Sequence, residues 1–396
     1  MSWEKVKIEN LCVIVRGSSP RPHGDPRYYN GPIPRLMIED LTRDGKYVTP
    51  KVDSLTVEGA NLSRPMLKGD LVITVSGRTG VPAILNVDCC IHDGFVGLRN
   101  LSKKVDINYI FHYLNSLTFV TNQQAVGAIF KNLTTDQLKN IEIPLPPLPI
   151  QKRIAEILDA ADALKRKDQE LLKKYDELAQ AIFIDMFGDP VKNEKGWEVN
   201  LLQNVTTKIG SGATPTGGKT AYKTEGITLI RSMNVYDFSF KWKDLAFIND
   251  AQATKLNNVT VMSKDILFNI TGASVCRCSI VPDELLPARV NQHVAIIRTK
   301  PEVLNPIFLN HLLVSNRIKT KLLGIGSGGG AVMEAITKDQ LEQFEIIVPP
   351  VKLQDEFEQL INNVFLQKST EIKIINNSDV LFNSLIQKAF NGELVA

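Results

Sequence analysis

The chain has 396 residues, of which 43% are hydrophobic and 22% charged, with 46 lysines and arginines against 43 aspartates and glutamates. This length favours two or more domains. No apolar run approaches the ~18 residues of a membrane span, and the first residues lack the apolar core of a signal peptide. We therefore expect a cytoplasmic protein. Five cysteines without a C-x-x-C pair predict neither a disulfide framework nor a zinc site.

Residues 1–150 have the pattern of a mixed, strand-rich domain. Short apolar runs such as residues 71–75 are broken by Gly and Pro turns, and a helical stretch is predicted at 107–116. These features predict a first globular domain of the α+β class.

A long helix is predicted over residues 151–187. The proline-rich run IPLPPLPIQKRI at 143–154 forces an extended approach, and the 151–187 segment contains neither Pro nor Gly. At 1.5 Å per residue such a helix is about 55 Å long. Apolar residues at steps of three and four predict one buried stripe, formed by Ile154, Ile157, Ala161, Leu164, Leu171, Tyr175, Leu178 and Ile182.

The second half of the chain repeats the first. Trp3 matches Trp197, Gln151 matches Gln354, and Phe187 matches Phe390. The offset drifts inside the globular part, which indicates loop insertions, and then stays constant through the helix, which indicates a fixed helix length. A second globular domain is therefore predicted at 188–353, and a second long helix with a short tail at 354–396.

Two amphipathic helices of equal length are predicted to bury their apolar stripes against each other. The predicted fold is thus α+β, with two pseudo-twofold-related, strand-rich domains separated by two long helices in an antiparallel coiled coil. The alternative is that each helix packs on its own globular domain. Both globular parts are mildly basic and both helices slightly acidic, so a polyanion would meet the globular parts.

Three motifs have a composition that suits ligand or metal binding. Residues 213–220 (ATPTGGKT) fit a relaxed phosphate loop, but a polar turn follows instead of a helix. Residues 324–329 (GIGSGG) match G-x-G-x-x-G after a predicted helix rather than a strand, which favours a surface loop. The Cys–His groups, Cys89-Cys90 with His92 and Cys276 and Cys278 with His293, lack the usual metal-ligand spacing. No catalytic constellation and no metal site are predicted.

With no catalytic or metal site predicted, the remaining candidate chemistry is recognition of a ligand by surface loops. Equivalent loops of the two halves interleave basic, aromatic and small polar residues, which suits contacts to phosphates and base edges. The predicted DNA-binding residues are Arg16, Ser18, Arg21, Arg27, Tyr28, Arg35, Ser76, Arg78, Thr79 and Lys131 in the first half. In the second half they are Lys208, Ser211, Thr214, Lys219, Tyr222, Arg231, Asn234, Asn269, Thr271 and Arg277.

The chain resembles the specificity subunit of a type I restriction-modification system over essentially its whole length. The resemblance rests on residues 143–154 and their copy at 347–350 (IVPP), on MFGDP at 186–190, on FNGEL at 390–394, and on the two-fold repeat. It implies a prokaryotic protein with two target-recognition domains, each of which reads one half of a split, asymmetric double-stranded DNA site. It also implies that the helices set the spacing and dock two methyltransferase (modification) subunits, with restriction (translocase and nuclease) subunits in a larger complex.

The sequence is therefore interpreted as a non-catalytic DNA-recognition scaffold. No cofactor is expected in this chain, and S-adenosylmethionine is expected in the partner methyltransferase. Two alternatives remain open: a nucleotide-dependent or methyl-transferring enzyme that uses the 213–220 loop, and a protein-interaction adaptor without DNA binding. Nucleotide binding that is lost in Lys219→Ala would support the enzyme. Salt-dependent DNA binding by the assembled complex would support the scaffold over the adaptor.

Overall fold

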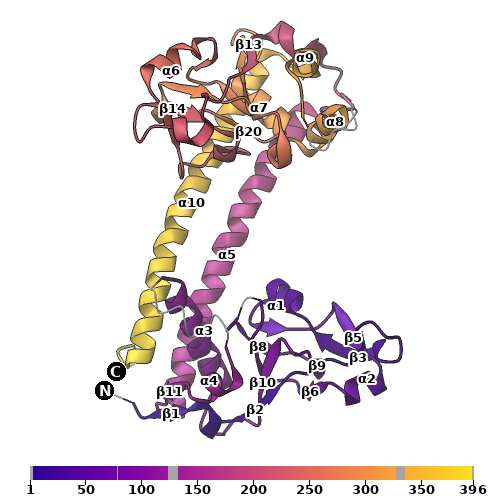
Figure 1. The fold of residues 1–396 in the computed structure, drawn as a ribbon, viewed down its shortest axis with the longest axis vertical. Helices are drawn as coiled ribbons and strands as arrows, with labels where there is room; N and C mark the ends of the chain where they lie inside the picture. The colour runs from indigo at the N-terminus through magenta and orange to yellow at the C-terminus, as the bar shows by residue number, and fades with distance from the viewer. Residues whose placement is uncertain (1–2, 78, 124–132, 327–334, 395–396) are drawn as a thin grey trace. The chain divides into compact units, whose positions relative to one another are not determined.

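The computed structural model describes residues 3–77, 79–123, 133–326 and 335–394. The chain forms two compact units, Met1–Gln169 with Lys373–Ala396, and Glu170–Ile372. Each unit combines one globular part with one segment of each of two long helices, α5 (Leu148–Phe187) and α10 (Val351–Asn391) (Figure 1). Neither long helix, nor any other helix in the described part of the chain, has the length and apolar character that crossing a membrane requires.

The first unit holds three sheets. Their strand orders are β1-β11, β2-β10-β7-β8-β4 and β5-β3-β9-β6. The strands are β1 (Lys5–Lys7), β2 (Val13–Arg16), β3 (Tyr29–Leu36), β4 (Tyr47–Val48), β5 (Asp53–Leu55), β6 (Arg64–Met66), β7 (Leu71–Thr74), β8 (Pro82–Leu85), β9 (Cys89–Ile91), β10 (Phe95–Arg99) and β11 (Glu142–Pro144). The shorter helices are α1 (Ile38–Asp44), α2 (Val57–Asn61), α3 (Ile107–Gln123) and α4 (Thr135–Lys139).

The second unit has the corresponding sheets β12-β23, β13-β22-β19-β20 and β17-β14-β21-β18, and a hairpin β15-β16. Its strands are β12 (Glu198–Leu201), β13 (Thr206–Ser211), β14 (Ile227–Ile230), β15 (Val235–Tyr236), β16 (Ser239–Phe240), β17 (Ala246–Ile248), β18 (Thr260–Val261), β19 (Ile266–Asn269), β20 (Cys278–Ile280), β21 (Ala288–Val290), β22 (Val294–Thr299) and β23 (Glu345–Val348). The shorter helices are α6 (Asp250–Thr254), α7 (Pro306–Val314), α8 (Asn316–Gly326) and α9 (Lys338–Glu342).

The two globular parts share one topology, which confirms the repeat and the α+β class predicted from the sequence. The central sheets share four antiparallel strands in equivalent order, β2-β10-β7-β8 and β13-β22-β19-β20, and the second sheet of each part contains one parallel pair, β3 with β9 and β14 with β21. The units differ mainly where β4 adds a fifth strand to the first central sheet and where the second unit forms the β15-β16 hairpin. Loops at equivalent places in the two sheets can therefore be compared residue by residue.

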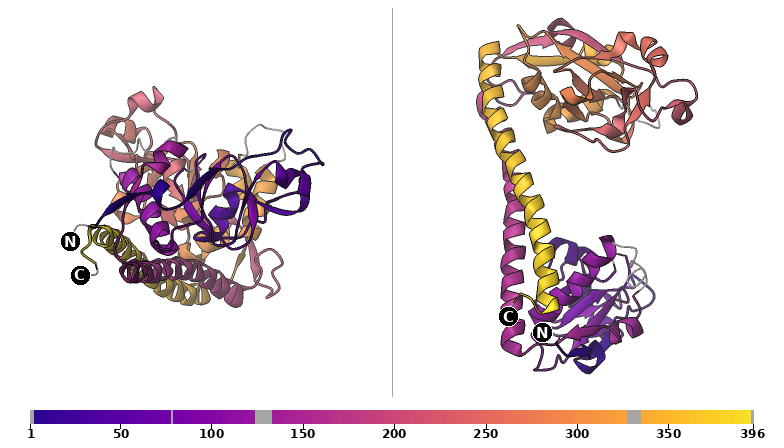
Figure 2. Two further views of the ribbon diagram at one scale, coloured as in Figure 1. Left: turned by 90° about the horizontal axis from the view of Figure 1, so that it is seen from below. Right: turned by 90° about the vertical axis from the view of Figure 1, so that its left-hand side faces the viewer.

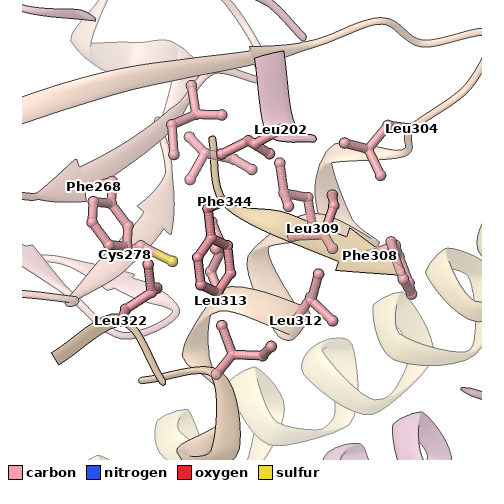
Figure 3. Packing of buried hydrophobic residues seen from close by; sticks show 14 of the residues in the cluster. Leu202, Phe268, Cys278, Leu304, Phe308, Leu309, Leu312, Leu313, Leu322 and Phe344 are labelled. Carbon is pink, nitrogen blue, oxygen red and sulfur yellow. The ribbon is translucent and has the colours of Figure 1, made fainter. Parts of the chain in front are cut away.

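Apolar side chains of the central sheet meet the helices that cover it. In the second unit, Phe268 of β19 and Cys278 of β20 are fully buried with Leu309, Leu312 and Leu313 of α7 (Figure 3). The cluster continues through Phe183 and Phe187 of α5 and Phe357 of α10. Each globular part is thereby fixed to its own segments of the long helices.

Within each unit the segments of α5 and α10 run antiparallel and side by side (Figure 2). In the first unit Lys165 Nζ lies 2.7 Å from Asp379 Oδ1, and Leu158 shares a core with Ile386. In the second unit Lys368 pairs with Asp176, nearer the middle of both helices, while Phe187 packs on Phe357. The predicted antiparallel pairing is confirmed within each unit, and the predicted twofold relation between the units stays a prediction.

The prediction of a buried apolar stripe on α5 is wrong for the middle of the helix. Leu164, Leu171 and Leu178 are 56%, 37% and 46% exposed. The seam runs one position further along the helix, because Lys165 contacts Asp379 of α10 and Ala179 is buried. The polar residues in the seam thus leave an apolar row on the outer surface of the helix.

Matching glutamines brace the start of both long helices. The Gln151 amide donates to Pro146 O (2.8 Å) and Lys104 O (2.9 Å) and accepts from Asp106 N (2.9 Å). Gln354 repeats this arrangement with Pro349 O (2.6 Å), Val303 O (3.0 Å) and Asn305 N (2.8 Å). Both glutamines are fully buried, and each satisfies one backbone N–H and two backbone carbonyl oxygens.

Candidate nucleic-acid interface

Three loops come together at one end of the central sheet in each unit. One follows β2 or β13, one follows β7 or β19, and one joins β9 to β10 or β21 to β22. Pairing of Val96 with Arg16 and of Ala295 with Ser211 sets the equivalence of these loops. By this register Ser19 corresponds to Thr214, and Asp93 to Gln292.

Glycine is required where the first loop passes the third. A Cβ atom on Gly17 would lie 1.9 Å from His92 O, and one on Gly212 would lie 1.8 Å from Val290 O. Any side chain at these two positions would push the loops apart. The close approach is what brings the side chains of the first and third loops within hydrogen-bond range.

In the first unit this approach joins Ser19 to Asp93. Ser19 Oγ donates to Asp93 Oδ1 at 2.8 Å, and this hydrogen bond holds the pKa of Asp93 below its usual range. Arg16 Nη2 donates to the Asp93 carbonyl oxygen at 3.0 Å, and Arg21 Nη2 lies 3.5 Å from Oδ2. Ser76 lies beside Gly94, so the predicted residues Arg16, Arg21 and Ser76 gather around the turn that carries the exposed Asp93.

Arg35 lies beneath this cluster rather than on its surface. Its guanidinium is 4% exposed and donates to Asp53 Oδ2 (2.5 Å) and Ser19 Oγ (2.7 Å). It also stacks over the Tyr29 ring, 5.3 Å from the centroid. Arg35 therefore positions Ser19, and only a rearrangement would bring it to a ligand.

The other predicted residues of the first unit are more scattered. Arg27 forms a paired contact with Asp25 (Nη2 to Oδ2, 2.7 Å) and lies over the Tyr28 ring, and it lowers the pKa of Asp25. Ser18 donates to Leu62 O at 3.0 Å. Thr79 is half-buried. Arg78 and Lys131 lie outside the described residues.

In the second unit, four side chains form a continuous hydrogen-bonded row. Thr214 Oγ1 donates to Gln292 Oε1, Gln292 Nε2 lies 3.2 Å from His293 Nε2, and His293 Nδ1 lies 2.6 Å from Thr271 Oγ1. The row borders an open depression of about 420 Å³. Among its lining residues are Ser232, Met233, Tyr236, Thr271, Arg277 and His293.

Aromatic rings support the basic residues of the second unit. The Arg277 guanidinium lies 4.6 Å from the centroid of Tyr236, and that of Arg231 lies 5.5 Å from Tyr222. Arg231 also donates to Asp244 O. Stacking of this kind holds a guanidinium in place while its edge stays open to a ligand.

Two predicted contacts are buried and support the loops from below. Asn234 and Asn269 are fully buried. Asn234 Nδ2 donates to Lys241 O at 3.0 Å, and Asn269 Nδ2 donates to Ser232 O at 2.9 Å. Lys208 and Ser211 are half-buried residues of β13, and the side chain of Lys219 lies outside the described part of the chain.

The nucleotide-site alternative does not fit the 213–220 loop. The segment that follows β13 leads into a four-residue 3-10 helix, Gly218–Ala221, and then to β14. A phosphate loop requires an α-helix there, whose first amides face the phosphates. Among the described residues, no group of three or more His, Cys, Asp or Glu side chains is placed to hold a metal ion.

Sequence reasoning missed the tips of the third loops. Asp93 and Gln292 were not among the predicted contacts, and His293 was weighed only as a metal ligand. The correspondence appears in the strand register of the structure, where both tips lie three residues before the paired positions Val96 and Ala295. Loop insertions elsewhere hid that correspondence in the linear repeat.

Comparison with known proteins shows which proteins the chain resembles. The family described as type I restriction modification DNA specificity domain matches residues 1–174. The MjaIX type I restriction enzyme specificity subunit of Methanocaldococcus jannaschii is 27% identical, over 99% of this chain and 93% of that protein. The EcoBI specificity subunit of Escherichia coli is 25% identical, over 100% of this chain and 87% of its own length.

Two solved structures have the same fold. One is a chain from the type I restriction-modification system, solved for its complex assembly and conformational transition, with a TM-score of 0.63, 19% identity, and coverage of 99% of this chain and 98% of that one. The other is the S subunit from M. genitalium, with a TM-score of 0.54, 14% identity, and coverage of 98% and 96%. The chain is thus similar in sequence, along nearly its whole length, to specificity subunits of type I restriction-modification systems, and its first 174 residues match the DNA specificity domain of these systems.

Proposed function

We propose that each globular part reads one half of a bipartite, non-palindromic DNA site. The observation that carries the proposal is the repeated three-loop cluster, which has the same backbone plan in both units but different side chains. The shared backbone arrangement places the loops of the two globular parts in equivalent positions, and their different side chains select different bases. Of the predicted residues, the exposed or half-buried Arg16, Arg21, Arg231 and Arg277 are the ones best placed for contacts to DNA.

The long helices are proposed to separate the two readers and to dock two modification subunits, with restriction subunits in a larger assembly. Support comes from an apolar row that the helix seam leaves exposed on one face of α5, formed by Leu164, Leu171 and Leu178. Large apolar side chains gathered on an exposed surface are typical of a protein interface. In this arrangement S-adenosylmethionine binds the partner subunit.

The DNA-reading role is tested by fluorescence anisotropy with the full-length chain and its modification subunits on duplex DNA. The affinity is expected to fall steeply with rising salt, because bound phosphates release counterions. Mapping of methylated sites in cells that carry the complex should give one split, asymmetric sequence. A palindromic sequence, or affinity that is independent of salt, would contradict the proposal.

The spacing role is tested by shortening both helices together. Deletion of residues 164–170 and 367–373 removes seven residues from each helix, or about 10 Å of helix length. The spacer of the methylated sequence should then shorten by about three base pairs, because base pairs rise 3.4 Å each. An unchanged spacer in a folded deletion variant would show that the helices do not set the spacing.

The docking role is tested on the exposed row of α5. Leu171→Glu with Leu178→Glu places charges on that row and should abolish co-purification of the modification subunit. Lys173→Glu with Gln180→Glu is the matched control, since both residues are exposed on nearly the opposite side of the same helix. Equal co-purification of both double variants would rule out this row as the docking surface.

A further inference from the structure

The third loop, which joins β9 to β10 in the first unit and β21 to β22 in the second, has the same shape in both units. In the first unit His92 Nδ1 accepts a hydrogen bond from Gly94 N at 2.9 Å. In the second unit Asn291 Oδ1 accepts from His293 N at 3.0 Å. Each bond closes a tight turn, and the residue at its tip is exposed: Asp93 in one unit and Gln292 in the other.

Each tip residue is held by a hydroxyl group from the equivalent neighbouring loop. Ser19 donates to Asp93 Oδ1 at 2.8 Å, and Thr214 donates to Gln292 Oε1. Gly17 and Gly212 permit these contacts, as described above. The hydroxyl groups fix the direction of both tip side chains before any ligand binds, which reduces the entropy lost on binding.

The hydrogen-bonding groups that remain free differ between the tips. A carboxylate accepts and never donates, so Asp93 offers only acceptor positions. Gln292 uses one lone pair of its oxygen toward Thr214 and one N–H toward His293. One acceptor and one donor therefore remain on the same fixed amide, and this holds for either orientation of the amide.

We propose that Asp93 and Gln292 are equivalent base-reading residues with different targets. Asp93 accepts from the N4 amino group of a cytosine in one half-site. Gln292 makes a paired contact to N6 and N7 of an adenine in the other half-site. These are the major-groove partners that match an acceptor-only group and a combined donor and acceptor.

The surroundings of Asp93 favour this assignment. Arg16 donates to the Asp93 carbonyl oxygen, Arg21 Nη2 lies 3.5 Å from Asp93 Oδ2, and both arginines are exposed, so phosphates can bind beside the Asp93 carboxylate. A carboxylate on a surface that meets a polyanion is repelled by the phosphates, and a hydrogen-bond donor on DNA offsets that repulsion. The amino group of cytosine is such a donor in the major groove.

The inference rests on the proposed DNA-reading function, and one experiment separates the two. The full-length chain with its modification subunits selects duplexes from a randomised DNA pool, and the bound sequences are read. The variants are Gln292→Glu, which turns the amide into a carboxylate, and Asp93→Asn, which turns the carboxylate into an amide. The controls are Gln203→Glu and Asp136→Asn, which make the same changes at exposed positions away from the loops.

The wild type should select a cytosine at a fixed position of one half-site and an adenine at a fixed position of the other. Gln292→Glu should change only that adenine to cytosine, and Asp93→Asn only that cytosine to adenine. The preference at each position should shift by about five- to 150-fold, with both controls unchanged.

A split wild-type sequence that neither variant alters would overturn the inference and leave the proposed function standing. Changes in both half-sites of a single variant would also overturn it, because each tip belongs to one reader. Failure of the wild type to select any split sequence would overturn both proposals.

Discussion

Replacement of Gln354 by leucine removes the brace at the start of α10 without changing the size of the side chain greatly. The substitution leaves Asn305 N, Val303 O and Pro349 O without their partner; Asn305 and Pro349 are buried, and Val303 is half-buried. A typical hydrogen bond contributes about 1 kcal/mol, and a buried group left without a partner costs about 1–3 kcal/mol. The free energy of unfolding of the second unit should therefore fall by about 3 kcal/mol.

Urea unfolding followed by tryptophan fluorescence measures this loss. Trp197 reports on the second unit, because its indole N–H donates to Phe187 O at 2.8 Å. Trp3→Phe and Trp242→Phe in the background leave Trp197 as the only indole. With a slope of about 3 kcal/mol per molar urea, the midpoint should fall by about 1 M.

Gln359→Leu is the matched control, since Gln359 is exposed on the same helix. It makes the same chemical change without removing a buried hydrogen bond, so its midpoint should stay within the experimental error of the background. The reasoning is refuted if Gln354→Leu and Gln359→Leu unfold at the same urea concentration with the same slope.

Three further predictions concern charge. Burial lowers the pKa of His311 to about 3 from 6.5, so the unfolded chain takes up a proton first and stability falls as pH drops from 6.5 towards 3. His311→Phe should remove this loss, which is about 2 kcal/mol at pH 5, as measured by urea unfolding across that range. Arg277→Ala should reduce the slope of log affinity against log salt by about 1 if its guanidinium binds a phosphate, and an unchanged slope in anisotropy titrations counts against that contact. Asp159→Ala leaves the buried Lys46 ammonium unpaired and should lower the free energy of unfolding of the first unit by about 3 kcal/mol; equal thermal stability would show that water reaches Lys46.

The architecture was largely predictable from periodicity and repetition. Helices expected at 151–187 and 354–390 span Leu148–Phe187 and Val351–Asn391. The extra turn before Gln151 includes Pro149, because a proline in the first turn loses no hydrogen bond. The position of the helix seam was not predictable in the same way. Leu164 fits an apolar stripe, yet the ion pair of Lys165 with Asp379 places the polar residue inside.

The loops of the candidate site were predictable, but the roles of their residues were not. Arg35, Asn234 and Asn269 have the composition of surface contacts and are buried, since tertiary packing decides which polar groups face inward. Asp93 and Gln292 look unlike each other in sequence. Only the strand register shows that they occupy one position in a shared frame.

The two-stranded sheets β1-β11 and β12-β23 mark places where such chains can exchange a globular part. Strand β1 pairs with β11 just before α5, and β12 pairs with β23 just before α10. Each globular part is thereby closed by two three- or four-residue strands that lie together at the base of a helix. Genetic exchange with crossovers in these short strands would replace an entire reader and leave the helices intact. A lineage could acquire a new DNA target in one recombination event, without a period in which the protein is misfolded.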